Sequence, residues 1–188
     1  MNSPPPSSVP IQITEVDSRT MGGIAAVMGQ EGDLAVTRLA RGCRCFAAWR
    51  QGELAGYGWV STQAEWIGEI QVELEPGPSE AYIWNCVTVP EHRRRGVFGA
   101  LLLGITEWGR AAGLSRLWIG SVAIPAEKAV RPAGFKPALE FASETVGDLH
   151  WLRVRPAEGA DSALVEAALR ALSVHPGAVL RRSHLRRH

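Results

Sequence analysis

Hydrophobic and polar positions along the chain switch between the two-residue period of strands and the longer period of helices. The alternating runs predict strands at about residues 9–16, 43–49, 53–61, 67–74, 81–89, 116–122, 137–145 and 149–155. Helical spacing predicts helices at about residues 18–28, 32–41, 97–112, 125–132 and 162–173. The triplet Arg50-Gln51-Gly52 predicts a hairpin turn between the second and third strands. This order of elements indicates an α/β domain built on a mixed sheet.

The most informative segment joins the strand at 81–89 to the helix at 97–112. Pro90 cannot donate a ladder hydrogen bond, so we expect the strand to stop there. Three arginines and Gly96 follow, directly before the helical run. A helix N-terminus carries unpaired N–H groups and a partial positive charge, so a glycine-containing basic loop at that point favours a phosphate site. The alternative is a solvated basic turn that only caps the helix.

These residues resemble the acetyl-CoA-binding motif of the GNAT acetyltransferases, whose loop reads Arg/Gln-x-x-Gly-x-Gly/Ala. Arg93 and Gly96 match that pattern, and a strand with a proline before it and a Leu-Leu pair after it match its surroundings. Phe98 takes the place of the small sixth residue, and Gly99 comes one position late. Ala133-Gly134-Phe135 corresponds to a Gly-Phe pair common in the family.

The resemblance implies the GNAT fold, an α/β class with a central, mostly antiparallel sheet, a splayed parallel strand pair and helices on both faces. It covers residues 9–155. Residues 1–8, rich in Pro and Ser, are predicted to be disordered, and residues 156–188 to add a C-terminal helix and a basic tail.

The resemblance also implies where acetyl-CoA, as co-substrate, would bind. The backbone of Val87 and Val89 would meet the pantetheine arm and the thioester. The loop would supply amides to the pyrophosphate, and an arginine of the loop could also reach the 3′-phosphate. The implied donor-binding residues are Val87, Val89, Arg93, Arg94, Arg95, Gly96, Val97, Phe98 and Gly99.

Two departures from the family bear on catalysis. Family members commonly carry an Asn and, one turn before the Gly-Phe pair, a Tyr that protonates the leaving thiolate. Counting back from Gly134, these positions fall on Ala123 and Val130, which cannot serve. The thiolate then leaves unassisted, or another residue such as Cys86 assists, although a strand cysteine is more often a packing residue.

The acceptor side is predicted from acidic residues. Residues 64–91 contain six glutamates and no Asp, Lys or Arg. If residues 67–75 form one strand, Glu69, Gln71, Glu73 and Glu75 share a face. An acceptor amine must lose a proton before it attacks, so Glu69 or Glu73 is the candidate general base. The alternative is an ordinary solvent-facing strand surface.

Composition narrows the class of protein further. The 188 residues, 46% hydrophobic and 21% charged, suit one globular domain. A net charge of +1 does not favour a nucleic-acid binder, and we expect no nucleic-acid or membrane partner. The N-terminus does not read as a signal peptide, so a cytoplasmic location is expected. Eighteen of the 20 basic residues are Arg, which suggests a bacterial source with a GC-rich genome.

Several single residues allow both a structural and a functional interpretation. Cys43 and Cys45 without a second pair do not predict a metal site, and no metal is expected. His92 is predicted to be a surface residue rather than a base. Tryptophans are expected in the core, although an aromatic acceptor pocket is the alternative; they include Trp59, Trp66, Trp84, Trp118 and Trp151.

The sequence therefore predicts an acetyl-CoA-dependent N-acetyltransferase that acts on a primary amine, either a small molecule or a peptide. A homodimer is expected, because such folds often pair. The alternative function is a non-catalytic acyl-CoA-binding or regulatory module, because both the Asn and Tyr equivalents are missing.

Overall fold

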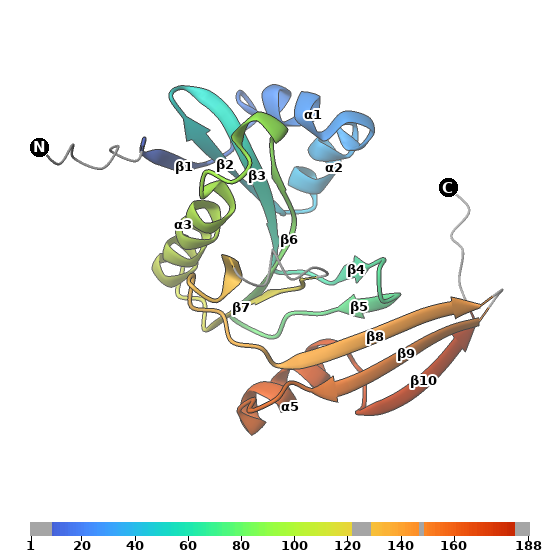
Figure 1. Ribbon diagram of the computed structural model, residues 1–188. Helices are drawn as coiled ribbons and strands as arrows, with labels where there is room; N and C mark the ends of the chain where they lie inside the picture. Colours follow the sequence, from blue (N-terminus) through green and yellow to red (C-terminus); the bar gives the residue numbers. More distant parts are fainter. Residues whose placement is uncertain (1–8, 122–128, 147–148, 183–188) are drawn as a thin grey trace, which may run out of the picture. The chain divides into compact units, whose positions relative to one another are not determined.

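The computed structural model describes residues 9–121, 129–146 and 149–182. They fall into two compact units (Figure 1). The first consists of residues 1–62 with 79–134, and the second of residues 63–78 with 135–188. The segment predicted as disordered, 1–8, and most of the helix predicted at 125–132 lie outside the described residues.

The first unit contains a five-stranded sheet, and the sequence predicts a strand at the place of each of its five strands. Its strands lie in the order β1 (Ile11–Glu15), β2 (Arg44–Arg50), β3 (Glu53–Ser61), β6 (Glu80–Thr88) and β7 (Arg116–Ile119). All neighbours are antiparallel except β6 and β7, which are parallel. The predicted hairpin joins β2 to β3 through Gln51 and Gly52, whose φ values of 55° and 81° suit a tight turn.

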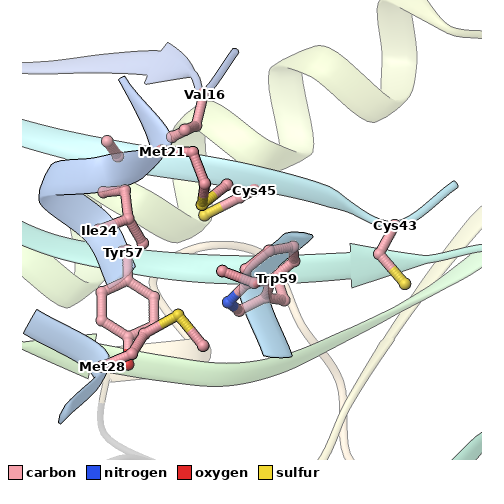
Figure 2. Packing of buried hydrophobic residues seen from close by; sticks show 10 residues of the cluster. Val16, Met21, Ile24, Met28, Cys43, Cys45, Tyr57 and Trp59 are labelled. Carbon is pink, nitrogen blue, oxygen red and sulfur yellow. The ribbon is translucent and has the colours of Figure 1, made fainter. Parts of the chain in front are cut away.

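Helices cover both faces of this sheet, which confirms the predicted layers. On one face, α1 (Met21–Met28) and α2 (Leu34–Ala40) pack over an apolar cluster that includes Ile24, Tyr57 and Trp59 (Figure 2). Gly58, between the last two, faces the other way: a Cβ there would lie 3.1 Å from Leu101 of α3 (Val97–Ala111). Because successive strand residues point to opposite faces, α3 covers the second face.

Short 3-10 segments mark the ends of two elements in this unit. The segment η1 (Gly29–Glu31) links α1 to α2. The segment η2 (Pro90–His92) follows β6, which ends at Thr88 as the proline predicts. The last residues of these segments, Glu31 and His92, belong to the candidate site described below.

The second unit contains a separate three-stranded sheet. Its strands are β8 (Leu139–Val146), β9 (Leu149–Pro156) and β10 (Gly177–Arg182), in the order β10-β9-β8. The first two confirm predicted strands, whereas β10 lies in the segment expected to be a basic tail. Helix α5 (Ser162–Ala171) begins as predicted after Asp161, whose Oδ1 accepts a hydrogen bond from the Leu164 amide at 3.0 Å.

The single strand predicted at 67–74 is wrong. The structure has a two-stranded hairpin there, β4 (Glu65–Ile67) paired with β5 (Val72–Leu74). Gln71 adopts a φ of 50°, and Glu69 lies in the turn. The alternation holds only within β5, where Val72 and Leu74 are buried and Glu73 is exposed. The four polar residues expected on one strand face therefore do not share one.

No helix in the described part of the chain is both long enough and apolar enough to cross a membrane.

Close packing of α3 on β1 gives a stability prediction. A Cβ at Gly104 would lie 2.7–2.9 Å from the branched stem of Ile13, so Gly104→Ala should lower the free energy of unfolding by about 1–2 kcal/mol. Gly23 in α1 has open space around it, so Gly23→Ala should instead stabilise by up to about 1 kcal/mol. Urea unfolding of both variants measures the difference; equal shifts would contradict the packing argument.

Candidate functional site

The segment after β6 is fixed to the sheet before it turns toward α3. The Val89 amide donates to the Ala55 carbonyl at 3.0 Å, and the His92 amide donates to the Val89 carbonyl at 2.9 Å. The His92 side chain is buried, with Nε2 3.5 Å from the Glu53 carboxylate. The predicted surface position of His92 is therefore wrong: the ring fastens the loop to the β2–β3 hairpin.

The loop residues expected to bind phosphate are brought together at the start of α3. Arg94 and Gly96 have φ values of 60° and 78°, which turn the chain sharply into the helix. Within the described part of the chain, the amides from Arg94 to Gly99 donate no hydrogen bond; the first that does is Ala100, to the Gly96 carbonyl at 3.0 Å. Unpaired amides at the positive end of a 15-residue helix favour an anion.

The side chains of this loop add positive charge. Arg93, Arg94 and Arg95 are all exposed, and in the described ranges none of them has a carboxylate partner. Phe98 is half-buried, one residue inside the helix. The arrangement can bind a group with several negative charges, such as a pyrophosphate.

The strands before and after α3 separate part-way along their length. β6 and β7 pair from Glu80 opposite Arg116 to Ile83 opposite Ile119. There β7 ends, while β6 continues to Thr88 without a β7 partner. Among the described residues no strand pairs with this edge of the segment, which contains Val87, and its backbone groups can bond an extended ligand in place of a strand.

The paired end of these strands is held by charged hydrogen bonds. The Glu80 carboxylate accepts from the Arg116 guanidinium and, at 2.7 Å, from Nε1 of Trp118. The Arg116 guanidinium also lies 5.1 Å from the centre of the Trp118 ring. Charge-assisted bonds of this kind hold β6 and β7 together at the Glu80 end, so the two strands separate only at the other end.

An irregularity in β6 lies next to the free segment. The register with β3 shifts between Tyr57 and Trp59, and Asn85 opposite them has a φ of 43°. Such a bulge changes which side chains face each side of the sheet. Trp84 and Val87, three residues apart, both pack against the α1 and α2 side.

The surroundings of Cys86 favour a packing role over that of a proton donor. Although the residue as a whole is half-buried, its Sγ packs where a Cβ on Gly58 would come within 2.8 Å, on the α3 side. Burial raises the pKa of the Cys86 thiol to about 12. A leaving thiolate whose thiol has the ordinary pKa of about 8.5 is a weaker base than the Cys86 thiolate. Proton transfer from Cys86 to that leaving thiolate is therefore unfavourable.

A polar cluster on the α1 and α2 side was not foreseen from the sequence. Glu31 accepts hydrogen bonds from Arg38 at 2.8 Å and from Asn85 at 3.0 Å. Arg38 is buried, and its guanidinium lies 4.5 Å from the centre of the Trp84 ring. Burial, and then the nearby Glu31 charge, raise the pKa of Tyr57. Glu31 and Asn85 are 54 positions apart in the sequence, and no local sequence pattern predicts that they meet.

The glutamates predicted as bases belong to the second unit. Glu69 is in the β4–β5 turn, where its carbonyl accepts from Ser143 Oγ at 3.2 Å. Glu73 stands on β5 opposite Trp66, and both carboxylates are exposed. Their role as bases stays a prediction.

The other predicted site residues fall in several places. Val130 is buried and apolar, while Ala123 lies outside the described residues. Trp59 and Trp84 are neighbours across β3 and β6, whereas Trp66 and Trp151 are exposed and belong to the second unit. Cys43 and Cys45 lie in the apolar core.

Two further findings concern metal and cavities. Within the described ranges, no group of three or more His, Cys, Asp and Glu residues is placed to hold a metal ion. An open cavity of about 530 Å³ lies beside β1, lined by Gln12, Thr14 and Trp49 among others. None of its lining residues belongs to the segment 84–99, so it is separate from the loop and the free strand edge.

Residues 18–135, well over half of the chain, match the family model described as the acetyltransferase (GNAT) family. The chain belongs to the GNAT acetyltransferase family. The matched range contains the separated strands and the basic loop, and the protein is an acyltransferase enzyme. This membership favours the enzyme over the non-catalytic module.

Solved structures share the GNAT fold at low sequence identity. The aminoglycoside N-acetyltransferase AAC(6')-Iy in complex with CoA is 15% identical, with a TM-score of 0.54 over 70% of this chain and 91% of that one. The same enzyme with the bisubstrate analogue CoA-S-monomethyl-acetylneamine gives 0.53 at 15% identity, over 67% and 90%. A ribosomal-protein-alanine N-acetyltransferase from Brucella melitensis biovar Abortus 2308 gives 0.52 at 15%, over 73% and 98%. No curated protein sequence matches the chain.

The loop geometry predicts how Gly96 variants bind acetyl-CoA. Gly96→Glu should abolish the rise in unfolding midpoint that acetyl-CoA produces, because it brings a negative charge to the anion site. Gly96→Ala is the matched control: it carries the same left-handed backbone cost, about 1–2 kcal/mol, without the charge. Micromolar acetyl-CoA affinity in Gly96→Glu would rule out the phosphate assignment.

The position of Cys86 gives a second prediction. Cys86→Ala should leave kcat within about twofold of the wild type, since a thiol with so high a pKa does not deliver the proton. Steady-state assays of CoA release test this. A loss of tenfold or more, with the unfolding midpoint unchanged, would return Cys86 to the list of catalytic groups.

Proposed function

We propose that this GNAT enzyme transfers the acetyl group of acetyl-CoA directly to a primary amine of a small molecule or a peptide. The observation that carries the proposal is the run of unpaired amides from Arg94 to Gly99, at the start of α3 and flanked by exposed arginines. Such a site suits the pyrophosphate of CoA. The CoA-bound structures of similar fold are consistent with acetyl-CoA as the co-substrate.

The free edge of β6 supplies the rest of the donor site in this proposal. The pantetheine arm lies along the segment from Trp84 to Thr88 and bonds to its backbone, as Val87 was expected to do. Val89 was expected to bond it too, but its amide already donates to Ala55 and its carbonyl already accepts from His92. A backbone N–H directed at the thioester carbonyl stabilises the oxyanion that forms during attack. Binding at both ends holds the thioester in place for an amine bound in the same complex.

The transfer step needs no covalent enzyme intermediate. The neutral amine nitrogen attacks the thioester carbonyl, a C–N bond forms, the C–S bond breaks, and CoA leaves as its thiolate. The proton lost by the amine passes to a carboxylate or through water to solvent. Val130 and Cys86 offer no proton donor, so the thiolate leaves unassisted, which the ordinary thiol pKa of about 8.5 permits near neutral pH.

The acceptor is proposed to be a cationic amine because the residues around the candidate base are acidic. Glu69 and Glu73 remain the proposed bases, and residues 64–91 contain no basic side chain. The enzymes of similar fold include one crystallised with an aminoglycoside-type analogue and one described as a ribosomal-protein-alanine N-acetyltransferase. A cytoplasmic location and a homodimer belong to the same proposal.

Donor binding and acetyl transfer are tested in sequence. Acetyl-CoA and CoA should raise the unfolding midpoint while ATP should not, because only the former fill both the phosphate site and the strand edge. Release of free CoA thiol is then followed with benzylamine, 1,4-diaminobutane, kanamycin and a peptide with an N-terminal alanine. A midpoint shift without turnover of any amine would favour the non-catalytic module.

The base assignment is tested by substitution. Glu69→Gln or Glu73→Gln should lower kcat about 10²-fold or more if that residue is the general base, while the acetyl-CoA midpoint shift stays unchanged. Glu75→Gln, an exposed neighbour on the same hairpin, is the control. Wild-type turnover in both variants would remove Glu69 and Glu73 from the mechanism.

A further inference from the structure

The carboxylate of Glu31 is held in one orientation from two sides. Its Oε2 accepts from Nη2 of Arg38 at 2.8 Å and from Nδ2 of Asn85 at 3.0 Å. In the described part of the chain, both hydrogen bonds of this carboxylate fall on the same oxygen, and 55% of the side chain is exposed. The carboxylate therefore presents its second oxygen with most of its hydrogen-bonding capacity unused.

Arg38 forms a rigid base behind this carboxylate. Its side chain is only 10% exposed, and its guanidinium lies 4.5 Å from the Trp84 ring centre and 5.4 Å from that of Trp59. Among the described residues, its buried Nη1 has no hydrogen-bond partner. A buried charge depends on a carboxylate partner, and here that partner is Glu31, which the ion pair holds in place.

Backbone packing fixes the same position. Glu31 ends η1, and Gly32 directly after it lies so close to α1 that a Cβ would come within 2.5 Å of the Ala25 carbonyl oxygen. On the other side, Asn85 occupies the β6 bulge with a φ of 43°. The site is thus built from two separate segments with little freedom.

The location relates this carboxylate to the reaction. Asn85 belongs to the part of β6 that continues past the end of β7 and that carries Val87. Helix α3, whose N-terminus holds the donor's phosphates, covers the opposite face of the sheet from Glu31. An acceptor that approaches the thioester from the side left open by the donor meets the α1 and α2 side.

We propose that Glu31 binds the ammonium group of the acceptor, oriented by Arg38 and Asn85. This assignment rests on the proposed function and names the residue that recognises the cationic amine. Charged hydrogen bonds contribute about 1.5–3 kcal/mol, which corresponds to a 10-fold to 100-fold change in affinity. At long range the charge of Arg38 cancels that of Glu31. An ammonium bonded to the second carboxylate oxygen nevertheless lies closer to the carboxylate than to the guanidinium, so the attraction exceeds the repulsion.

The test uses whichever of the four amines named above the wild type turns over fastest. The kinetic constants for that amine are compared between the wild type and the variants. Glu31→Gln should raise KM for that amine about 10-fold to 100-fold, with kcat and the acetyl-CoA midpoint shift within about twofold of the wild type. Glu31→Asp keeps the charge and should recover part of the loss, and Asn85→Ala should raise KM less than Glu31→Gln. Glu15→Gln, which removes an exposed ion pair with Arg44 on β1 and β2, is the matched control.

The outcomes separate this assignment from the proposed function. Unchanged amine KM in Glu31→Gln, with the wild type active, would overturn the role of Glu31 and leave the proposed function intact. A fall in kcat at constant KM would also overturn it, since that pattern belongs to a base. Absence of wild-type turnover with all four amines would overturn the proposed function and this assignment together.

Discussion

The separation of β6 from β7 is the constraint on which the active site depends. Backbone N–H and C=O groups that leave a ladder must find other partners, and here β6 runs on from Trp84 to Thr88 after β7 has ended. The charged bonds around Glu80 hold the strands together at one end, so the separation is confined to the other. A chain that leaves a strand edge open inside a domain presents a binding surface for an extended molecule.

The loop after β6 combines with this edge because of how the helix begins. Gly96 and Arg94 turn the chain with positive φ values, so the unpaired amides of α3 start only a few residues from the free edge. His92, buried against Glu53, fixes the loop to the β2–β3 hairpin. A ligand with phosphates at one end and an extended arm can therefore meet both features without a large rearrangement of the loop.

The two faces of the sheet differ in their packing and in their charge. The α3 side is apolar and closely packed, as the approaches of Gly58 to Leu101 and of Gly104 to Ile13 show. The α1 and α2 side is apolar at its centre but holds a buried arginine whose charge is balanced by a half-exposed glutamate. Burying Arg38 costs desolvation energy, which its ion pair with Glu31 offsets in part.

The sequence by itself determined the elements whose signals are local. Pro90 ended β6, the apolar spacing after Gly96 set α3, and Asp161 capped α5, because turns, caps and periodicity act over a few residues. Only the tertiary structure decided what depends on distant contacts: the break of residues 67–74 into a hairpin, the pairing of β10 with β9, and the meeting of Glu31, Arg38 and Asn85. Such contacts are stabilised by partners far along the chain, and no local pattern encodes which partner a side chain will find.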